Sequence, residues 1–99
     1  MRGAMTYRTT LQADQDIIDI YLWGCREFGQ PRAERYHAGL ALTLDLIGDN
    51  PRMARERTEF NPAVRMHPYQ AHMIVYLLDD SGVLIVRVLH GRQDWERYL

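Results

Sequence analysis

The apolar residues that follow position 10 recur every three or four positions, which is the spacing of one face of a helix. This pattern predicts a first helix from about Leu11 to Phe28. Thr10 is placed to cap this helix, and Thr9 with Gln12 offers an alternative capping box. The residues predicted to form its buried face are Ile17, Ile18, Tyr21, Leu22, Cys25 and Phe28.

A second helical pattern begins after the sequence "FGQP". Gly29 is suited to the turn, and Pro31 is suited to the first turn of a helix that runs to about Ile47. The residues predicted to be buried on it are Ala33, Tyr36, Leu40, Leu44 and Ile47. Because the turn is so short, the two helices are expected to lie antiparallel as a helical hairpin.

Extended segments account for most of the remaining apolar residues. The alternating sequence "MTYRTT" predicts a short first strand, and a polar, arginine-rich loop at 51–63 separates the helices from three more. These later strands are predicted at Val64–Pro68, Ala71–Asp79 and Val83–His90, with "DDSG" as a hairpin turn between the last two. The order β-α-α-β-β-β predicts an α+β fold, with a small, mostly antiparallel sheet packed on the helical hairpin. Residues 5–99 are expected to form a single domain after a flexible extension at 1–4.

The last two predicted strands have no clearly polar face. In the first of them, His72, Ile74, Tyr76 and Leu78 alternate with Met73, Val75 and Leu77. In the second, Val83, Ile85, Arg87 and Leu89 alternate with Leu84, Val86, Val88 and His90. A two-helix hairpin covers one face only, so the other face is expected to meet a protein partner or a part of this chain. The loop at 51–63 and the C-terminal "WERYL" are the two segments that could fold back over it.

The charge balance argues against broad, phosphate-driven binding to nucleic acid, although it leaves room for a local basic patch. The chain of 99 residues has twelve arginines, no lysine and thirteen acids, for a net charge of −1. Binding driven by phosphates requires several of them to be neutralised at once. The single Cys25 cannot form an internal disulfide, and no apolar run approaches the roughly 18–20 residues of a membrane helix. A cytoplasmic location without membrane contact is therefore expected.

The end of the last strand carries the candidate chemistry. Arg87 interrupts an apolar run, so its charge is expected either to contact a target or to pair with an acid. His90 and Arg92 follow at the strand end, which suggests an active site, a binding surface or a simple polar turn. His67, His72 and His90 match no metal-ligand spacing, so no metal or other cofactor is expected.

The chain as a whole resembles the ParE toxins of the RelE/ParE superfamily. "YRTTLQADQDIIDIY" resembles their first strand and helix, and "FGQPRAERY" is similar to the start of their second helix. "NPRMARER" looks like their Asn-Pro-x-x-Gly/Ala-Arg loop, and "IVRVLHGRQD" looks like their most recognisable block. The resemblance covers about residues 5–99, with Thr9 as a small departure where leucine is common.

The resemblance implies the toxin half of a bacterial type II toxin–antitoxin pair. ParE proteins break no covalent bonds, and the best-studied members poison DNA gyrase, so no catalytic residue and no small-molecule substrate are expected. A ParD-type antitoxin lays its C-terminal segment across the toxin, while its N-terminal part binds promoter DNA, so contact with DNA is indirect. The alternative is a RelE-like ribosome-dependent mRNA endonuclease, for which Arg65, Arg87, His90 and Arg92 would be the charged constellation.

Two groups of contact residues are predicted from these arguments. The exposed strand end gives the candidate contacts with the toxicity target, which are Arg87, His90, Arg92 and Trp95. The apolar strands give the candidate contacts with the antitoxin, which are Tyr76, Leu78, Val75, Leu77, Val86 and Val88.

Overall fold

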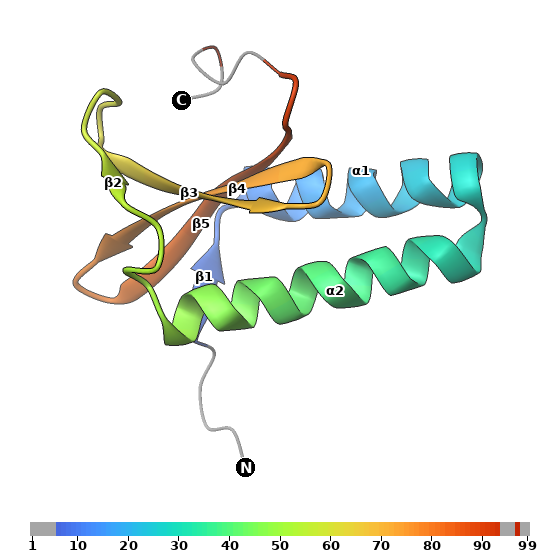
Figure 1. Ribbon diagram of the computed structural model, residues 1–99, viewed down its shortest axis with the longest axis horizontal. Coiled ribbons are helices and arrows are strands. Elements are labelled where there is room, and N and C mark those ends of the chain that lie inside the picture. Colours follow the sequence, from blue (N-terminus) through green and yellow to red (C-terminus); the bar gives the residue numbers. More distant parts are fainter. Residues whose placement is uncertain (1–5, 94–96, 98–99) are drawn as a thin grey trace.

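The two helices form an antiparallel hairpin that lies along one side of a five-stranded sheet (Figure 1). The computed structural model describes residues 6–93 and residue 97. Its elements are β1 (Tyr7–Thr9), α1 (Leu11–Phe28), α2 (Gln30–Asp49), β2 (Glu56–Arg57), β3 (Val64–Tyr69), β4 (His72–Asp79) and β5 (Gly82–His90). The extension predicted at 1–4 lies outside the described residues.

The strand order in the sheet is β1-β5-β4-β3-β2. β1 pairs with β5 in parallel, and the other three pairings are antiparallel. The α+β fold with a mostly antiparallel sheet is therefore confirmed. The short strand β2 was not predicted, because its two residues lie inside the polar loop at 51–63.

The start of α1 follows the predicted cap. Thr10 Oγ1 accepts a hydrogen bond from the backbone N–H of Ala13 at 3.0 Å, and the same hydroxyl donates to the carbonyl of Val86 at 2.7 Å. Thr9 instead donates its hydroxyl to the carboxylate of Asp14, so the alternative capping box is not formed. The Thr10 side chain thus satisfies a free helix N–H and ties α1 to β5.

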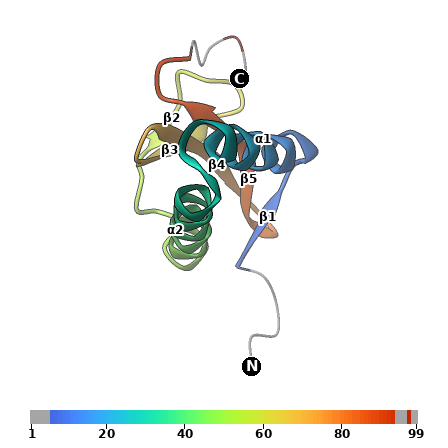
Figure 2. The ribbon, with the colours of Figure 1, turned by 90° about the vertical axis from the view of Figure 1, so that its right-hand side faces the viewer.

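The predicted buried face of α1 is wrong by part of a turn. Ala13 is fully buried, Ile17 and Ile20 pack against the core, but Ile18 and Leu22 are each 50% exposed. Small residues set this orientation, because a Cβ built on Gly24 would lie 3.3 Å from the Cβ of Ala33 on α2. The spacing of large apolar residues does not reveal contacts between small residues, although these contacts allow two helices to approach most closely. In Figure 2, which looks along the hairpin, α1 and α2 lie side by side.

A β-bulge changes the faces of β5. Val75 pairs with Arg87 and Tyr76 pairs with Ile85, so Val86 is an extra residue on β5. The bulge puts Val88 with Val83 and Ile85 in the core beneath the helices, and it moves Leu89 to the opposite side. The predicted alternation of β5 is therefore wrong beyond Val86.

The side of the sheet away from the helices is partly covered by the chain itself. Phe60, from the loop at 51–63, packs against a small second core. That core consists of Val64, Met66, Val75 and Leu89, with Met73 and Val86 at its margin. Covering by this loop is thus observed. The other covering segment that was considered, "WERYL", lies outside the described residues except for residue 97.

Candidate functional site

The six candidate antitoxin contacts divide between the two sides of the sheet. Tyr76, Leu78 and Val88 belong to the helix side, and Val75 and Val86 belong to the second core. Leu77 shares the face of Val75 by strand alternation. Three of the six, Val75, Tyr76 and Val88, are at most 3% exposed, and the other three are partly exposed. The accessible part of this group is Leu77, Leu78 and Val86.

Arg87 pairs with an acid on α1. Its Nε donates to Asp16 Oδ2 at 2.8 Å, and its Nη2 donates to Asp16 Oδ1 at 2.9 Å. Asp16 Oδ2 also accepts the backbone N–H of Val88 at 2.9 Å. The side chains of Arg87 and Asp16 are 21% and 14% exposed, so this bidentate salt bridge is mostly buried. Of the two roles open to Arg87, the ion pair is the one that the fold contains.

His90 is the last residue of β5, and Arg92 lies in the turn that follows; both residues are exposed. The backbone N–H of His90 donates to Gln93 Oε1 at 2.6 Å, and the N–H of Arg92 donates to His90 Nδ1 at 3.2 Å. These bonds fix the turn and leave the Arg92 side chain exposed. Trp95, the fourth candidate target contact, lies outside the described residues.

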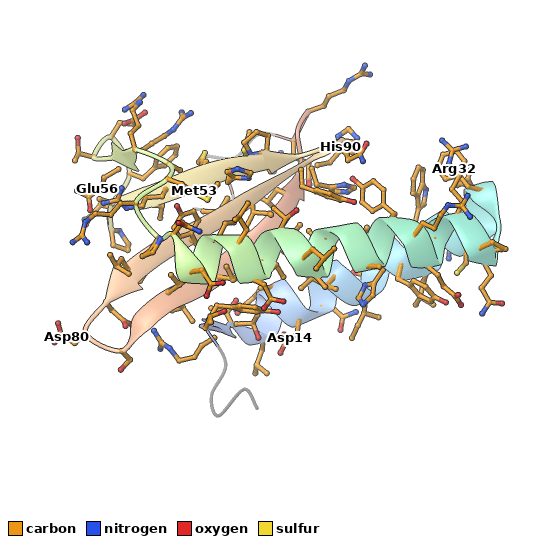
Figure 3. All side chains as sticks on the ribbon, turned by 60° about the horizontal axis from the view of Figure 1, so that its bottom comes forward. Asp14, Arg32, Met53, Glu56, Asp80 and His90 are labelled. Atoms are coloured by element: carbon orange, nitrogen blue, oxygen red, sulfur yellow. The ribbon has the colours of Figure 1, made fainter. Side chains whose placement is uncertain are left out.

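A pocket that was not predicted lies beside His90. It has a volume of about 480 Å³ and is bounded by α1, the first half of α2, the β3–β4 turn and the end of β5. We call it the aromatic pocket, because its walls include Tyr21, Trp23, Phe28, Tyr36 and Tyr69. The helical hairpin extends beyond the sheet on this side, as Figure 1 shows, so the pocket forms where the hairpin meets the turn. In Figure 3, His90 lies at the strand end and Arg32 near the start of α2.

A tyrosine–histidine cluster forms one wall of the aromatic pocket. The Tyr69 hydroxyl donates to the carbonyl of Tyr36 at 3.1 Å, and the Tyr36 hydroxyl lies 2.7 Å from His72 Nδ1. The rings of Tyr36 and Tyr69 meet edge to face at 5.0 Å, and those of His72 and His90 do so at 5.5 Å. Burial raises the pKa of the Tyr36 hydroxyl. These contacts hold the wall in a fixed shape. Among the described residues, no group of three or more His, Cys, Asp or Glu side chains is placed to hold a metal ion.

Gly39 is required by the position of Tyr69. A Cβ built on Gly39 would lie 3.0 Å from Cζ of Tyr69 and closer still to its hydroxyl. We expect Gly39→Ala to lower the free energy of unfolding by about 1 kcal/mol, because overpacking outweighs the helix propensity that alanine gains. The midpoint of thermal unfolding should then be about 4–8 °C lower. With Tyr69→Leu already present, the same change should become stabilising; a penalty that persists there would contradict this explanation.

The pKa of His72 is lowered, first by burial and then by repulsion from His90, while Asp16 acts in the opposite direction. The neutral ring next to Tyr36 thus stabilises the fold above about pH 6.5, the pKa of a histidine in an unfolded chain. That contribution is lost as the pH falls through the lower pKa of the folded state. We expect the free energy of unfolding to fall more steeply from about pH 7 to about pH 5 in the original chain than in His72→Gln. Parallel curves from urea titrations would contradict the assignment.

Two of the four residues of the nuclease constellation are engaged inside the protein. Arg65 donates from Nη1 to the carbonyl of Ala54 at 2.6 Å, and Arg87 is bridged to Asp16. Only His90 and Arg92 of the four are exposed.

The described helices include none that is long and apolar enough to cross a membrane.

Comparison with known proteins agrees with this architecture. The ParE1 toxin of Mycobacterium tuberculosis is 33% identical over 81 residues, which are 79% of this chain and 83% of that toxin. The ParE toxin of Escherichia coli is 30% identical over 90 residues, which are 89% of this chain and 86% of that toxin. A solved structure of the chromosomal ParDE TA system from P. aeruginosa has the same fold, with a TM-score of 0.75 at 16% identity. It covers 87% of this chain and 95% of that chain.

The family match spans nearly all of the described residues. A model of the ParE toxin of the type II toxin–antitoxin system, parDE, matches residues 7–95. This range begins at β1, includes both helices and every strand, and continues past the exposed turn at His90. The chain therefore belongs to the ParE toxin family of type II toxin–antitoxin systems.

Proposed function

We propose that this chain is a non-enzymatic poison of DNA gyrase that blocks replication in the bacterial cytoplasm. A ParD-type antitoxin neutralises it by tight binding and supplies the contact with promoter DNA. The family membership supports the toxin role, and the position of Arg87 carries the choice against nuclease chemistry. A guanidinium held by both oxygens of Asp16 is not available to stabilise charge on a phosphate.

The test is to induce the chain alone in bacteria and to follow both candidate activities. A gyrase poison is expected to cause filamentation, a DNA-damage response and covalent gyrase–DNA adducts, and co-expression of the antitoxin should prevent all three. Purified chain should also inhibit supercoiling by purified gyrase. Rapid cleavage of ribosome-bound mRNA, without gyrase adducts, would overturn this proposal in favour of the RelE-like nuclease.

We assign the contact with gyrase to the exposed end of β5. His90 ends β5 and Arg92 lies in the next turn, where the backbone N–H groups of both residues donate to side chains, and Trp95 follows in sequence. Arg87 lies earlier on β5 and supports this end through its bridge to α1. The partly exposed Leu77 and Val86 are assigned to antitoxin contacts on the side of the sheet away from the helices, and the partly exposed Leu78 to antitoxin contacts on the helix side.

Arg92→Ala is expected to reduce toxicity on induction by about tenfold, because an arginine at an interface is often a dominant contact. Antitoxin binding and thermal stability should be unchanged, since the side chain is exposed and its backbone bond to His90 remains. Arg52→Ala, an exposed arginine before β2, is the matched control. Full toxicity of both Arg92→Ala and Trp95→Ala would place the gyrase contact elsewhere.

A further inference from the structure

The aromatic pocket is open to solvent although its walls are largely apolar. Trp23 is 48% exposed and Phe28 is 51% exposed, and both lie on its rim. Large aromatic rings contribute most when they are buried, so a pair left half in water favours a partner that covers it. The volume of about 480 Å³ falls within the range of pockets that enclose a bulky group.

The charge of the pocket differs from that of its surroundings. The fully charged side chains that line it are Arg32 and Arg35, and no carboxylate is among its described lining residues. Residues 11–50, which include both helices, carry seven acids and three arginines. The pocket is thus a basic site within an acidic half of the chain, which favours an acidic partner and disfavours a basic one.

Several side chains around the pocket are held in place by contacts within the chain. We call its charged edge, Arg32 and Arg35, the basic rim. The guanidinium carbon of Arg32 lies 4.5 Å from the centre of the Phe28 ring, which is a cation–π contact. Phe28 in turn meets Trp23 edge to face at 5.5 Å. On the opposite wall, Tyr36 is held between Tyr69 and His72. Side chains that are held in this way lose little conformational freedom on binding, so the entropy cost of binding is lower.

We propose that the aromatic pocket anchors the antitoxin. It takes one bulky apolar side chain of the antitoxin's toxin-binding segment, and a carboxylate of the same segment pairs with Arg32 or Arg35. This inference rests on the proposed function, because it names how the antitoxin of that pair is recognised. The pocket opens at the surface between the hairpin and the β3–β4 turn, so a side chain can enter while its own backbone stays outside.

The first test reverses the charge of the rim. The dissociation constant of the purified cognate ParD-type antitoxin is measured with the original chain and with Arg32→Glu/Arg35→Glu. The double variant is expected to bind at least about tenfold more weakly, with the largest difference at low salt. Arg26→Glu is the control, because Arg26 is exposed on α1 and does not line the pocket. It should change binding less than about twofold.

The second test fills the pocket without altering its charge. Ala71 is exposed in the β3–β4 turn and lines the pocket, so Ala71→Trp places a ring at its mouth. Weaker antitoxin binding at an unchanged thermal midpoint is expected. This variant keeps the inference testable if the double glutamate variant fails to fold.

The outcomes separate this inference from the proposed function. If the original chain binds no antitoxin, the toxin–antitoxin assignment itself fails. If the original chain binds but the rim and pocket variants bind equally well, the anchor lies elsewhere and the inference is overturned. Variants that keep full antitoxin affinity but lose toxicity would also overturn it, because the pocket would then belong to the toxicity target.

Discussion

Tyr76→Asp is expected to prevent folding at room temperature. Tyr76 is fully buried between the sheet and the helices, and its hydroxyl donates to the carbonyl of Pro51 at 2.8 Å. The change deletes a large core ring, which alone costs about 3–5 kcal/mol, and introduces a carboxyl group without a suitable partner. A small protein has a total stability of only about 5–15 kcal/mol. Circular dichroism and the width of the amide proton spectrum measure the loss directly.

Two further variants separate the contributions at this position. Tyr76→Phe keeps the ring and loses only the hydrogen bond to Pro51, so it should cost about 1 kcal/mol. Leu78→Asp lies on the same strand and the same face but is partly exposed, so the chain should still fold. A folded Tyr76→Asp variant would show that β4 does not pack beneath the helices as described.

Asp16→Ala is expected to lower the free energy of unfolding by about 3 kcal/mol, the cost of removing the acid from a mostly buried ion pair. The carboxylate of Asp16 accepts two bonds from Arg87 and one from the backbone N–H of Val88. Its removal takes away an acceptor that all three donors share beside β5. Urea denaturation measures the change, and Asp19→Ala, an exposed acid on the same helix, should cost less than about 0.5 kcal/mol.

A double-mutant cycle isolates the bridge itself. Arg87→Met removes the charge but keeps a long apolar side chain, so Asp16→Ala should be much less costly in that background than in the original chain. Equal costs in the two backgrounds would mean that Asp16 acts through Val88 alone. The same pair of variants tests function, because an Arg87→Met chain that folds and remains toxic would limit Arg87 to a structural role.

The sequence predicts the helices and the fold class well because those features depend on local signals. Thr10 and Gly29 mark the ends of α1, and the spacing of Leu40, Leu44 and Ile47 identifies the buried face of α2. The family resemblance rested on similar blocks spread along the chain, and the match over residues 7–95 confirms it. The parallel pairing of β1 with β5 follows from none of these local signals.

The errors arise where packing between distant elements decides the outcome. The face of α1 depends on the contact of Gly24 with Ala33, and the faces of β5 depend on an extra residue at Val86. Neither is visible in the periodicity of apolar residues, which assumes unbroken alternation and large side chains. Arg87 was correctly seen as exceptional, but its partner Asp16 lies 71 positions away.

The aromatic pocket could not be predicted for a related reason. Its lining residues come from five elements, and on α1 they include Trp23, which does not belong to the predicted buried face. One signal was present, since Trp23 is a large aromatic residue near the end of a helix and lies off the predicted buried face; Phe28 was instead predicted to be buried and is 51% exposed. In the structure these two rings line a pocket whose other side is the β3–β4 turn.

The pairing of Tyr7 with Val83 has a consequence for synthesis on the ribosome. β5 lies between β1 and β4 in the sheet, yet it is the last of the described strands to be made. Chains that grow from the N-terminus tend to fold as their parts emerge. Here the helical hairpin leaves the ribosome before β5, the strand that joins β1 to the rest of the sheet. The sheet can close only after β5 has emerged, so any activity that needs the folded toxin begins late.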